Sequence, residues 1–211
     1  MKAFNEENIT KRSNLEISDS LSAYLGHSAQ QNPFAYEAFY NFLNTVKPKR
    51  IIEIGTASGG FTLFLKFCCT DLDLETDIVS YEIHDRPSYD FVRSHGVDIR
   101  VENIFGENYS SVTQEPIDYI QQEGVTVVLC DGGHKISEFN VLSPFLKPGD
   151  FIMAHDYACN STYFSENIEK KYWNWLEIQD SDIQQAVDSN NLESFMQEEF
   201  NKAVWVCKIK K

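Results

Sequence analysis

Short, continuous apolar runs alternate along the chain with longer segments whose apolar residues recur every three or four positions. The continuous runs are typical of buried strands, and the periodic segments are typical of helices that pack on one face. Asn32-Pro33 precedes the clearest helical segment and Pro48 ends it, because proline suits a first helical turn but not a helix interior. The pattern predicts strands at 50–54, 77–83, 97–102, 125–130, 151–155 and 202–209, and helices at 33–47, from about 60, at 113–122 and at 136–145.

The alternation of strands and helices predicts an α/β fold in which a parallel sheet carries helices on both faces. The run 125–130 is apolar almost throughout, so we expect it at the centre of the sheet. The segment 162–200 is helical or irregular in pattern, and we expect its Trp173 and Trp175 to pack in the core or in a lid. At 211 residues, the chain is long enough for one domain with a full core.

A glycine-rich turn follows the first predicted strand, in the sequence Glu53-Ile-Gly-Thr-Ala-Ser-Gly-Gly60. Glycines let the backbone turn tightly and approach a ligand closely, and a helix N-terminus follows at once. The spacing differs from the Gly-x-Gly-x-x-Gly of dinucleotide-binding folds and from a P-loop. Because Glu53 would repel a phosphate, the turn favours a ligand with an amino group or a sulfonium. The alternative is a turn that binds nothing.

Charge and cysteine content narrow the classes of partner. The chain has 32 acidic residues against 18 lysines and arginines, which gives a net charge of −14. Nucleic acids and anionic membranes bind basic surfaces, so the charge argues against both and favours a small or neutral substrate. The five cysteines include no Cys-x-x-Cys pair, which argues against a disulfide framework or a structural zinc site. The N-terminus has no apolar signal core, and we expect a cytoplasmic protein.

Acids and histidines gather where the predicted strands end. Ligands of open α/β sheets bind beyond the carboxyl ends of the strands. Glu82 ends the second strand, where a carboxylate can accept hydrogen bonds from both hydroxyls of a ribose. Asp131-Gly-Gly-His134 and His155-Asp156 end the fourth and fifth strands, and such a group of carboxylates and imidazoles can hold a divalent cation. The alternative is that Asp131 caps the next helix and His155 is packed in the core.

Taken together, these motifs resemble those of class I S-adenosylmethionine-dependent methyltransferases. Within that class, the chain looks most like the metal-dependent branch of cephalosporin-hydroxylase-like proteins and macrolide-sugar O-methyltransferases. The resemblance implies a Rossmann-like, seven-stranded, mostly parallel sheet with an antiparallel C-terminal strand and helices on both faces. It runs from about Gly26 to Tyr157 and rests on Gln31-Asn32-Pro33, the glycine-rich turn, Val79-Ser-Tyr-Glu82, Asp131-Gly-Gly-His134 and Leu146-Lys-Pro-Gly149 before His155-Asp156.

The resemblance also implies roles for single residues. A histidine three residues after the first acid serves as the base in relatives, which matches His134, and Lys135 beside it would favour the neutral imidazole. Relatives usually have Glu where this chain has His155, which shifts the preference from Mg²⁺ toward Mn²⁺ or another transition ion, or removes that ligand. The implied cofactor contacts are Glu53, Gly55, Thr56, Gly59, Gly60, Glu82, Asn103, Phe105 and Asp131; the implied metal ligands are Asp131, His155 and Asp156; the implied catalytic residues are His134 and Asp131.

The implied activity is transfer of a methyl group from S-adenosylmethionine to a hydroxyl of a small molecule or sugar, with a divalent cation, Mg²⁺ or Mn²⁺, near the acceptor. Two alternatives stay open: an accessory protein that binds the cofactor or its product without transfer, and a metal-independent methyltransferase that uses Asp131 and His134. We expect residues 1–211 to form a single methyltransferase-like domain, with an N-terminal arm or cap at 1–30, a cofactor-binding core at 31–160, and a C-terminal helix and closing strand at 161–211. The sequence leaves homo-oligomerisation open.

Overall fold

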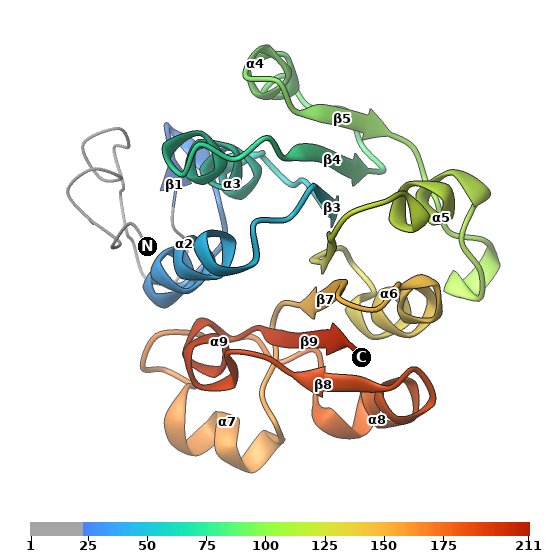
Figure 1. The fold of residues 1–211 in the computed structure, drawn as a ribbon. Helices are drawn as coiled ribbons and strands as arrows, with labels where there is room; N and C mark the ends of the chain where they lie inside the picture. Colours follow the sequence, from blue (N-terminus) through green and yellow to red (C-terminus); the bar gives the residue numbers. More distant parts are fainter. Residues whose placement is uncertain (1–22) are drawn as a thin grey trace.

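A seven-stranded sheet forms the centre of residues 23–211, the part of the chain that the computed structural model describes (Figure 1). Its strands are β3 (Arg50–Ile54), β4 (Asp77–Glu82), β5 (Asp98–Val101), β6 (Thr126–Cys130), β7 (Phe151–Ala154), β8 (Leu192–Ser194) and β9 (Val206–Lys210). They lie in the order β5-β4-β3-β6-β7-β9-β8. The first five in this order pair in parallel, and β9 is antiparallel to both β7 and β8. This arrangement confirms the predicted Rossmann-like sheet with an antiparallel C-terminal strand.

Helices cover both faces of this sheet, as the sequence predicted. Successive strand residues point to opposite faces, so Ile51 of β3 lies in one apolar core and Ile52 lies in the other. The first core includes residues of α2 (Pro33–Val46), α3 (Gly60–Asp71), α4 (Tyr89–Ser94) and α9 (Gln197–Ala203), and the second includes residues of α5 (Gln114–Gln121), α6 (Lys135–Leu142) and α8 (Asp180–Ser189). A third, smaller cluster joins α7 (Ser161–Asn167) to Trp173.

Local sequence signals set both ends of α2. The Asn32 side chain accepts a hydrogen bond of 3.0 Å from the backbone N–H of Phe34, which satisfies one of the free donors at the helix start. Pro33 takes the first helical position, as predicted. The chain leaves the helix through Lys47, which has a φ of +51°, and Pro48 follows. The predicted helix is therefore confirmed at both ends.

The start of the predicted closing strand, at 202–209, is wrong. Helix α9 continues to Ala203, and β9 begins only at Val206. Phe200 and Ala203 lie three residues apart on one helical face and are both fully buried, so packing against the core favours helix in this stretch. Val204, with a φ of +57°, ends the helix.

The described N-terminal residues form a small hairpin that the sequence pattern did not predict. Its strands are β1 (Ala23–Tyr24) and β2 (His27–Ser28), and both turn residues between them have positive φ. The Tyr24 ring packs edge-on against Phe64 of α3, with ring centroids 5.7 Å apart. Residues 1–22 of the predicted arm lie outside the described residues. In the described range, no helix combines the length and the apolar character that crossing a membrane requires.

Candidate cofactor and metal site

The glycine-rich turn connects β3 to α3 and lies against the end of β6. Gly55 has a φ of +92°, and a Cβ atom there would overlap the backbone carbonyl of Asp131. A Cβ atom at Gly60 would overlap the backbone carbonyl of His27. Because glycine alone fits these close approaches, the turn can lie directly on two neighbouring segments.

A cavity of about 340 Å³ opens at the carboxyl ends of β3, β4, β5 and β6. Its volume falls in the range of small-molecule sites, roughly 300–1,000 Å³. We call it the cofactor cavity because six of the predicted site residues line it: Gly55, Glu82, Asn103, Phe105, Asp131 and His134.

The walls of the cofactor cavity differ from end to end. At the β4 end, Glu82 accepts hydrogen bonds from the backbone N–H groups of Ala57, at 3.1 Å, and Ile83, at 2.8 Å. At the other end, the ring of Tyr109 lies between Phe105 and His134, with centroids 5.0 and 4.1 Å away. The cavity therefore offers an anchored carboxylate at one end and aromatic surface at the other.

Four predicted cofactor contacts do not line this cavity: Glu53, Thr56, Gly59 and Gly60. Glu53 is buried and accepts hydrogen bonds from the hydroxyls of Thr62, at 2.6 Å, and Ser80. Burial raises the pKa of Glu53 to about 7, against the effect of these two hydrogen bonds. The buried Thr56 hydroxyl lies 2.6 Å from that of Ser80. These residues support the turn from inside, and their contact with a cofactor stays a prediction.

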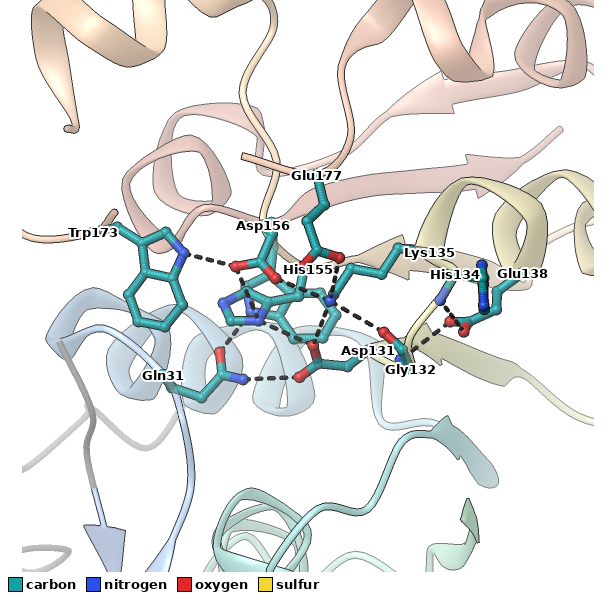
Figure 2. Close-up of polar contacts among 11 residues, drawn as sticks. Gln31, Asp131, Gly132, His134, Lys135, Glu138, His155, Asp156, Trp173 and Glu177 are labelled. Atoms are coloured by element: carbon teal, nitrogen blue, oxygen red, sulfur yellow. Dashed lines mark hydrogen bonds and ion pairs between the residues drawn. The ribbon is translucent and has the colours of Figure 1, made fainter. Parts of the chain in front are cut away.

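A second cavity, of about 350 Å³, lies beside the first and shares Gln30, Asp131 and Gly132 with it. Its polar wall contains five charged or titratable residues that point toward one another (Figure 2). We call these residues the acidic cluster: Asp131, Lys135, His155, Asp156 and Glu177.

The side chains of the acidic cluster bind one another closely. His155 Nδ1 lies 3.0 Å from Asp131 Oδ1 and 3.8 Å from Asp156 Oδ1. Lys135 Nζ lies 2.9 Å from Asp156 Oδ2, 2.9 Å from Glu177 Oε2 and 3.8 Å from Asp131 Oδ1. The strand ends thus bring together the three predicted metal ligands, and the first turn of α6 adds a lysine that contacts two of them.

Burial and neighbouring charge oppose each other in the cluster. Burial lowers the pKa of His155, but Asp131 and Asp156 outweigh it and raise the pKa above its usual value. Burial raises the pKa of Asp156, but His155 and Lys135 outweigh it and lower the pKa. Burial also lowers the pKa of Lys135, but Asp131 and Asp156 outweigh burial and raise this pKa above its usual value. Near neutral pH, Asp156 is therefore a carboxylate and Lys135 an ammonium.

A family model described as Rhamnosyl O-methyltransferase/CmcI matches residues 18–202, which is most of the chain. The chain belongs to the rhamnosyl O-methyltransferase/CmcI family. This assignment confirms the predicted enzyme class, an S-adenosylmethionine-dependent O-methyltransferase. No curated protein matches the chain.

Solved structures of CmcI have the same fold as this family member. A CmcI apo structure matches with a TM-score of 0.61 at 10% identity, covering 100% of this chain and 85% of that one. A CmcI structure with magnesium and S-adenosylmethionine matches with a TM-score of 0.59 at 9% identity, covering 90% and 76%. A putative caffeoyl-CoA O-methyltransferase from Staphylococcus aureus matches with a TM-score of 0.50 at 12% identity, covering 97% and 88%. At these identities the likeness establishes the fold alone.

The family assignment raises the question whether the acidic cluster fits a divalent cation. One ligand atom from each of Asp131, His155 and Asp156 lies within 4.8 Å of the others. In an octahedral ion with bonds near 2.1 Å, neighbouring ligands are about 3 Å apart and opposite ligands about 4.2 Å apart. The distances of 3.0 and 3.8 Å from His155 Nδ1 lie within this span. Nδ1 is the imidazole nitrogen that lies near both carboxylates, whereas the buried Nε2 has no hydrogen-bond partner among the described residues. The donor set therefore fits a divalent cation with the deprotonated Nδ1 of His155 as one ligand.

Several residues of this site were not predicted from the sequence. Trp173 Nε1 donates a hydrogen bond of 2.7 Å to Asp156 Oδ1, and Gln31 Nε2 donates one of 3.1 Å to Asp131 Oδ2. Glu138 accepts hydrogen bonds of 3.1 Å from the backbone N–H groups of Gly132 and His134 and so holds the loop after β6. Of these residues, only Gln31 could have been identified from the sequence, because it belongs to the motif before α2 on which the resemblance rests.

Proposed function

We propose that this family member transfers the methyl group of S-adenosylmethionine to a hydroxyl of a small molecule or sugar, with the help of a divalent cation. The observation that carries the proposal is the position of Asp131, which lines both cavities. A methyl donor in the cofactor cavity and an acceptor in the second cavity would meet at this residue. Reactions between groups held in this way gain much of their rate from positioning.

The cofactor cavity suits a nucleoside such as the adenosine part of S-adenosylmethionine. We assign Glu82 to the ribose hydroxyls, since a carboxylate accepts hydrogen bonds from both. The rings of Phe105 and Tyr109, 5.0 Å apart, offer a surface for the adenine, with Asn103 beside them. The close approach of Gly55 to Asp131 keeps this cavity next to the acidic cluster.

Asp131, His155 and Asp156 would hold the cation. A bound divalent cation supplies a Lewis acid that lowers the pKa of an acceptor hydroxyl. Two carboxylates with one imidazole suit Mn²⁺ as well as Mg²⁺. Trp173 and Gln31 each donate a hydrogen bond to one of the two carboxylates and so keep their oxygens oriented.

The two predicted catalytic residues lie in different surroundings. Asp131 faces both cavities, whereas His134 lines the cofactor cavity and packs against the Tyr109 ring at a tilt of 40°. A base must come within hydrogen-bonding reach of the hydroxyl that it deprotonates. His134→Ala separates the possible roles. Lost turnover with unchanged affinity for S-adenosylhomocysteine supports the base, and lost affinity assigns His134 to the cofactor wall.

Thermal unfolding with S-adenosylhomocysteine tests cofactor binding first, with and without Mg²⁺ or Mn²⁺. A ligand at about 100 times its dissociation constant adds roughly 2.7 kcal/mol of stability. For a chain of this size we expect Tm to rise by about 5–10 °C, and to rise further with one of the ions. An unchanged Tm under all conditions would contradict the proposed cofactor site.

Turnover is tested by formation of S-adenosylhomocysteine with a panel of sugars and other hydroxylated acceptors. We expect turnover that EDTA abolishes and that added Mn²⁺ or Mg²⁺ restores. The metal-independent alternative, with Asp131 and His134 as an acid–base pair, predicts turnover that is indifferent to EDTA.

A further inference from the structure

Lys135 stands beside the predicted metal ligands as a cation of the protein itself. We infer that its ammonium competes with the divalent ion for Asp156, and that Glu177 takes up the ammonium when the ion binds. Lys135 and Glu177 would then set the metal affinity of the site without being ligands. This inference rests on the proposed metal site.

The geometry places the ammonium against two of the three predicted ligands. Lys135 begins α6, and its side chain points toward Asp156 and Glu177 (Figure 2). Only 7% of the side chain is exposed. Besides its ion pairs, Nζ donates a hydrogen bond of 3.1 Å to the backbone carbonyl of Gly132. The ammonium is thus held inside the acidic cluster and does not extend into solvent.

The charges of the cluster explain why this lysine matters for an ion. Three carboxylates, those of Asp131, Asp156 and Glu177, surround the single ammonium of Lys135. A bound divalent ion and the ammonium together would place three positive charges against these three negative charges. Because the ammonium is in contact with Asp156, it repels an entering cation and shares the oxygens that would attract it. Removing the positive charge should therefore strengthen metal binding.

Glu177 is placed to hold the ammonium when Asp156 is occupied. The backbone N–H groups of Glu177 and Ile178 both donate to the backbone carbonyl of Asp156, at 2.8 and 3.2 Å. These bonds tie the Glu177 segment to the end of β7. Its carboxylate lies 2.9 Å from Lys135 Nζ on a side chain that is 46% exposed. Neutralising Glu177 should therefore weaken metal binding, because the ammonium would then depend on Asp156 more strongly.

Mn²⁺ binding to metal-free protein, measured by electron paramagnetic resonance of the free ion, tests the inference. We expect Lys135→Met to bind Mn²⁺ about tenfold more tightly than the unchanged protein, and Lys135→Gln to change affinity in the same direction. Glu177→Gln should bind Mn²⁺ about threefold more weakly than the unchanged protein. In the Lys135→Met background, the same substitution should weaken Mn²⁺ binding by a smaller factor. Lys49→Met, at the far end of β3, is the matched control and should leave the affinity unchanged.

Two further measurements keep the test sharp. Asp131→Asn should abolish Mn²⁺ binding, which locates the ion at the cluster, and S-adenosylhomocysteine binding reports that each variant is folded. Unchanged or weaker Mn²⁺ binding by folded Lys135→Met and Lys135→Gln would overturn the competition. If no protein binds Mn²⁺ while all bind S-adenosylhomocysteine, the metal part of the proposed function fails together with this inference. Should the Lys135 variants not fold, Glu177→Gln still decides, since tighter or equal binding contradicts the role given to Glu177.

Discussion

The two cavities meet at Asp131, but they are built in different ways. The cofactor cavity is formed by backbone turns and by side chains such as Glu82 and Phe105 that lie at separate strand ends. In the acidic cluster, the charged groups bind one another, with Lys135 paired to Asp156 and Glu177. The first region therefore depends on close backbone approach, and the second depends on the balance of charge. Substitutions should affect the two regions through these different causes.

The largest effect should come from a change that breaks the contact between the two regions. At Gly55 a Cβ atom would overlap the Asp131 carbonyl, and the φ of +92° is itself unfavourable for other residues. We expect Gly55→Ala to lower the free energy of unfolding by about 4 kcal/mol and to remove S-adenosylhomocysteine binding. Urea unfolding measures the first effect and calorimetry the second.

Gly133→Ala is the matched control for this change. Gly133 lies in the loop after β6, and a Cβ atom there would have nothing within 4 Å. We expect a change of about 0.5 kcal/mol or less. Similar losses at both glycines would contradict the view that the β3–α3 turn depends on its approach to Asp131.

Asp131→Asn should have the next largest effect, and it should separate the two regions. The amide keeps the shape of the side chain but removes a charge shared by His155 and Lys135. We expect turnover to fall by about 1,000-fold, while affinity for S-adenosylhomocysteine changes by about threefold or less. The same substitution at Asp188, on the exposed surface of α8, should leave both quantities unchanged. A parallel loss of cofactor affinity in Asp131→Asn would show that the regions are not independent.

Glu53→Gln tests the buried carboxyl beneath the glycine-rich turn through its pH dependence. The pKa of Glu53 is about 7 in the folded protein, against an ordinary value of 4.5, so the folded state binds more protons between these pH values. Stability should therefore fall as the pH rises from 4.5 to 7, by about 3 kcal/mol for this group. Glutamine does not ionise, and the variant should lose that part of the slope. Urea unfolding at pH 4.5 and pH 8 measures how much the free energy of unfolding changes between these pH values in each protein. An equal change in both proteins would mean that Glu53 is not the group responsible for the pH dependence.

Glu82→Gln should weaken ligand binding in the cofactor cavity and leave the acidic cluster unchanged. The carboxylate is anchored by the backbone N–H of Ala57, and a neutral amide is a weaker acceptor for ribose hydroxyls. We expect affinity for S-adenosylhomocysteine to fall by about tenfold, with Mn²⁺ binding unchanged. Glu107→Gln, a nearby exposed acid outside the cavity lining, serves as the control. Unchanged cofactor affinity in Glu82→Gln would remove Glu82 from the ribose site.

The parallel part of the sheet was largely predictable because most of its strands are short, mainly apolar runs between clear breaks. Strand β8 was missed, because Leu192-Glu-Ser194 is not an apolar run and lies in the segment predicted to be helical or irregular. Strand ends such as Ile54 and Cys130 match the sequence pattern, since the central strands are buried on both faces and carry continuous apolar residues. The start of β9 was not predictable, because Val204 and Trp205 are apolar in either a helix end or a strand. Tertiary packing of Phe200 and Ala203 decided between the two.

The site was predictable where strand ends converge and unpredictable where distant segments enter. Asp131, His155 and Asp156 gather because β6 and β7 are parallel neighbours. Trp173 and Glu177 come from the irregular segment after α7, and no spacing in the sequence places them against β7. The direction of the Lys135 side chain could not be predicted from the sequence either. Lys135 pairs with Asp156 and Glu177, which are distant in the sequence, and not with the adjacent His134.

Trp173→Phe should have the smallest effect, and it examines how the acidic cluster is held. The indole N–H donates to Asp156 Oδ1, while the ring packs 5.0 Å from the imidazole of His155. Phenylalanine keeps the ring contact and loses the donor, so we expect a loss of about 1 kcal/mol in urea unfolding. Trp175→Phe, at a ring that is 44% exposed, should cost less. Equal losses for the two variants would mean that the indole N–H adds nothing beyond ring packing, and that Asp156 is held in place by its pairing with Lys135 and His155.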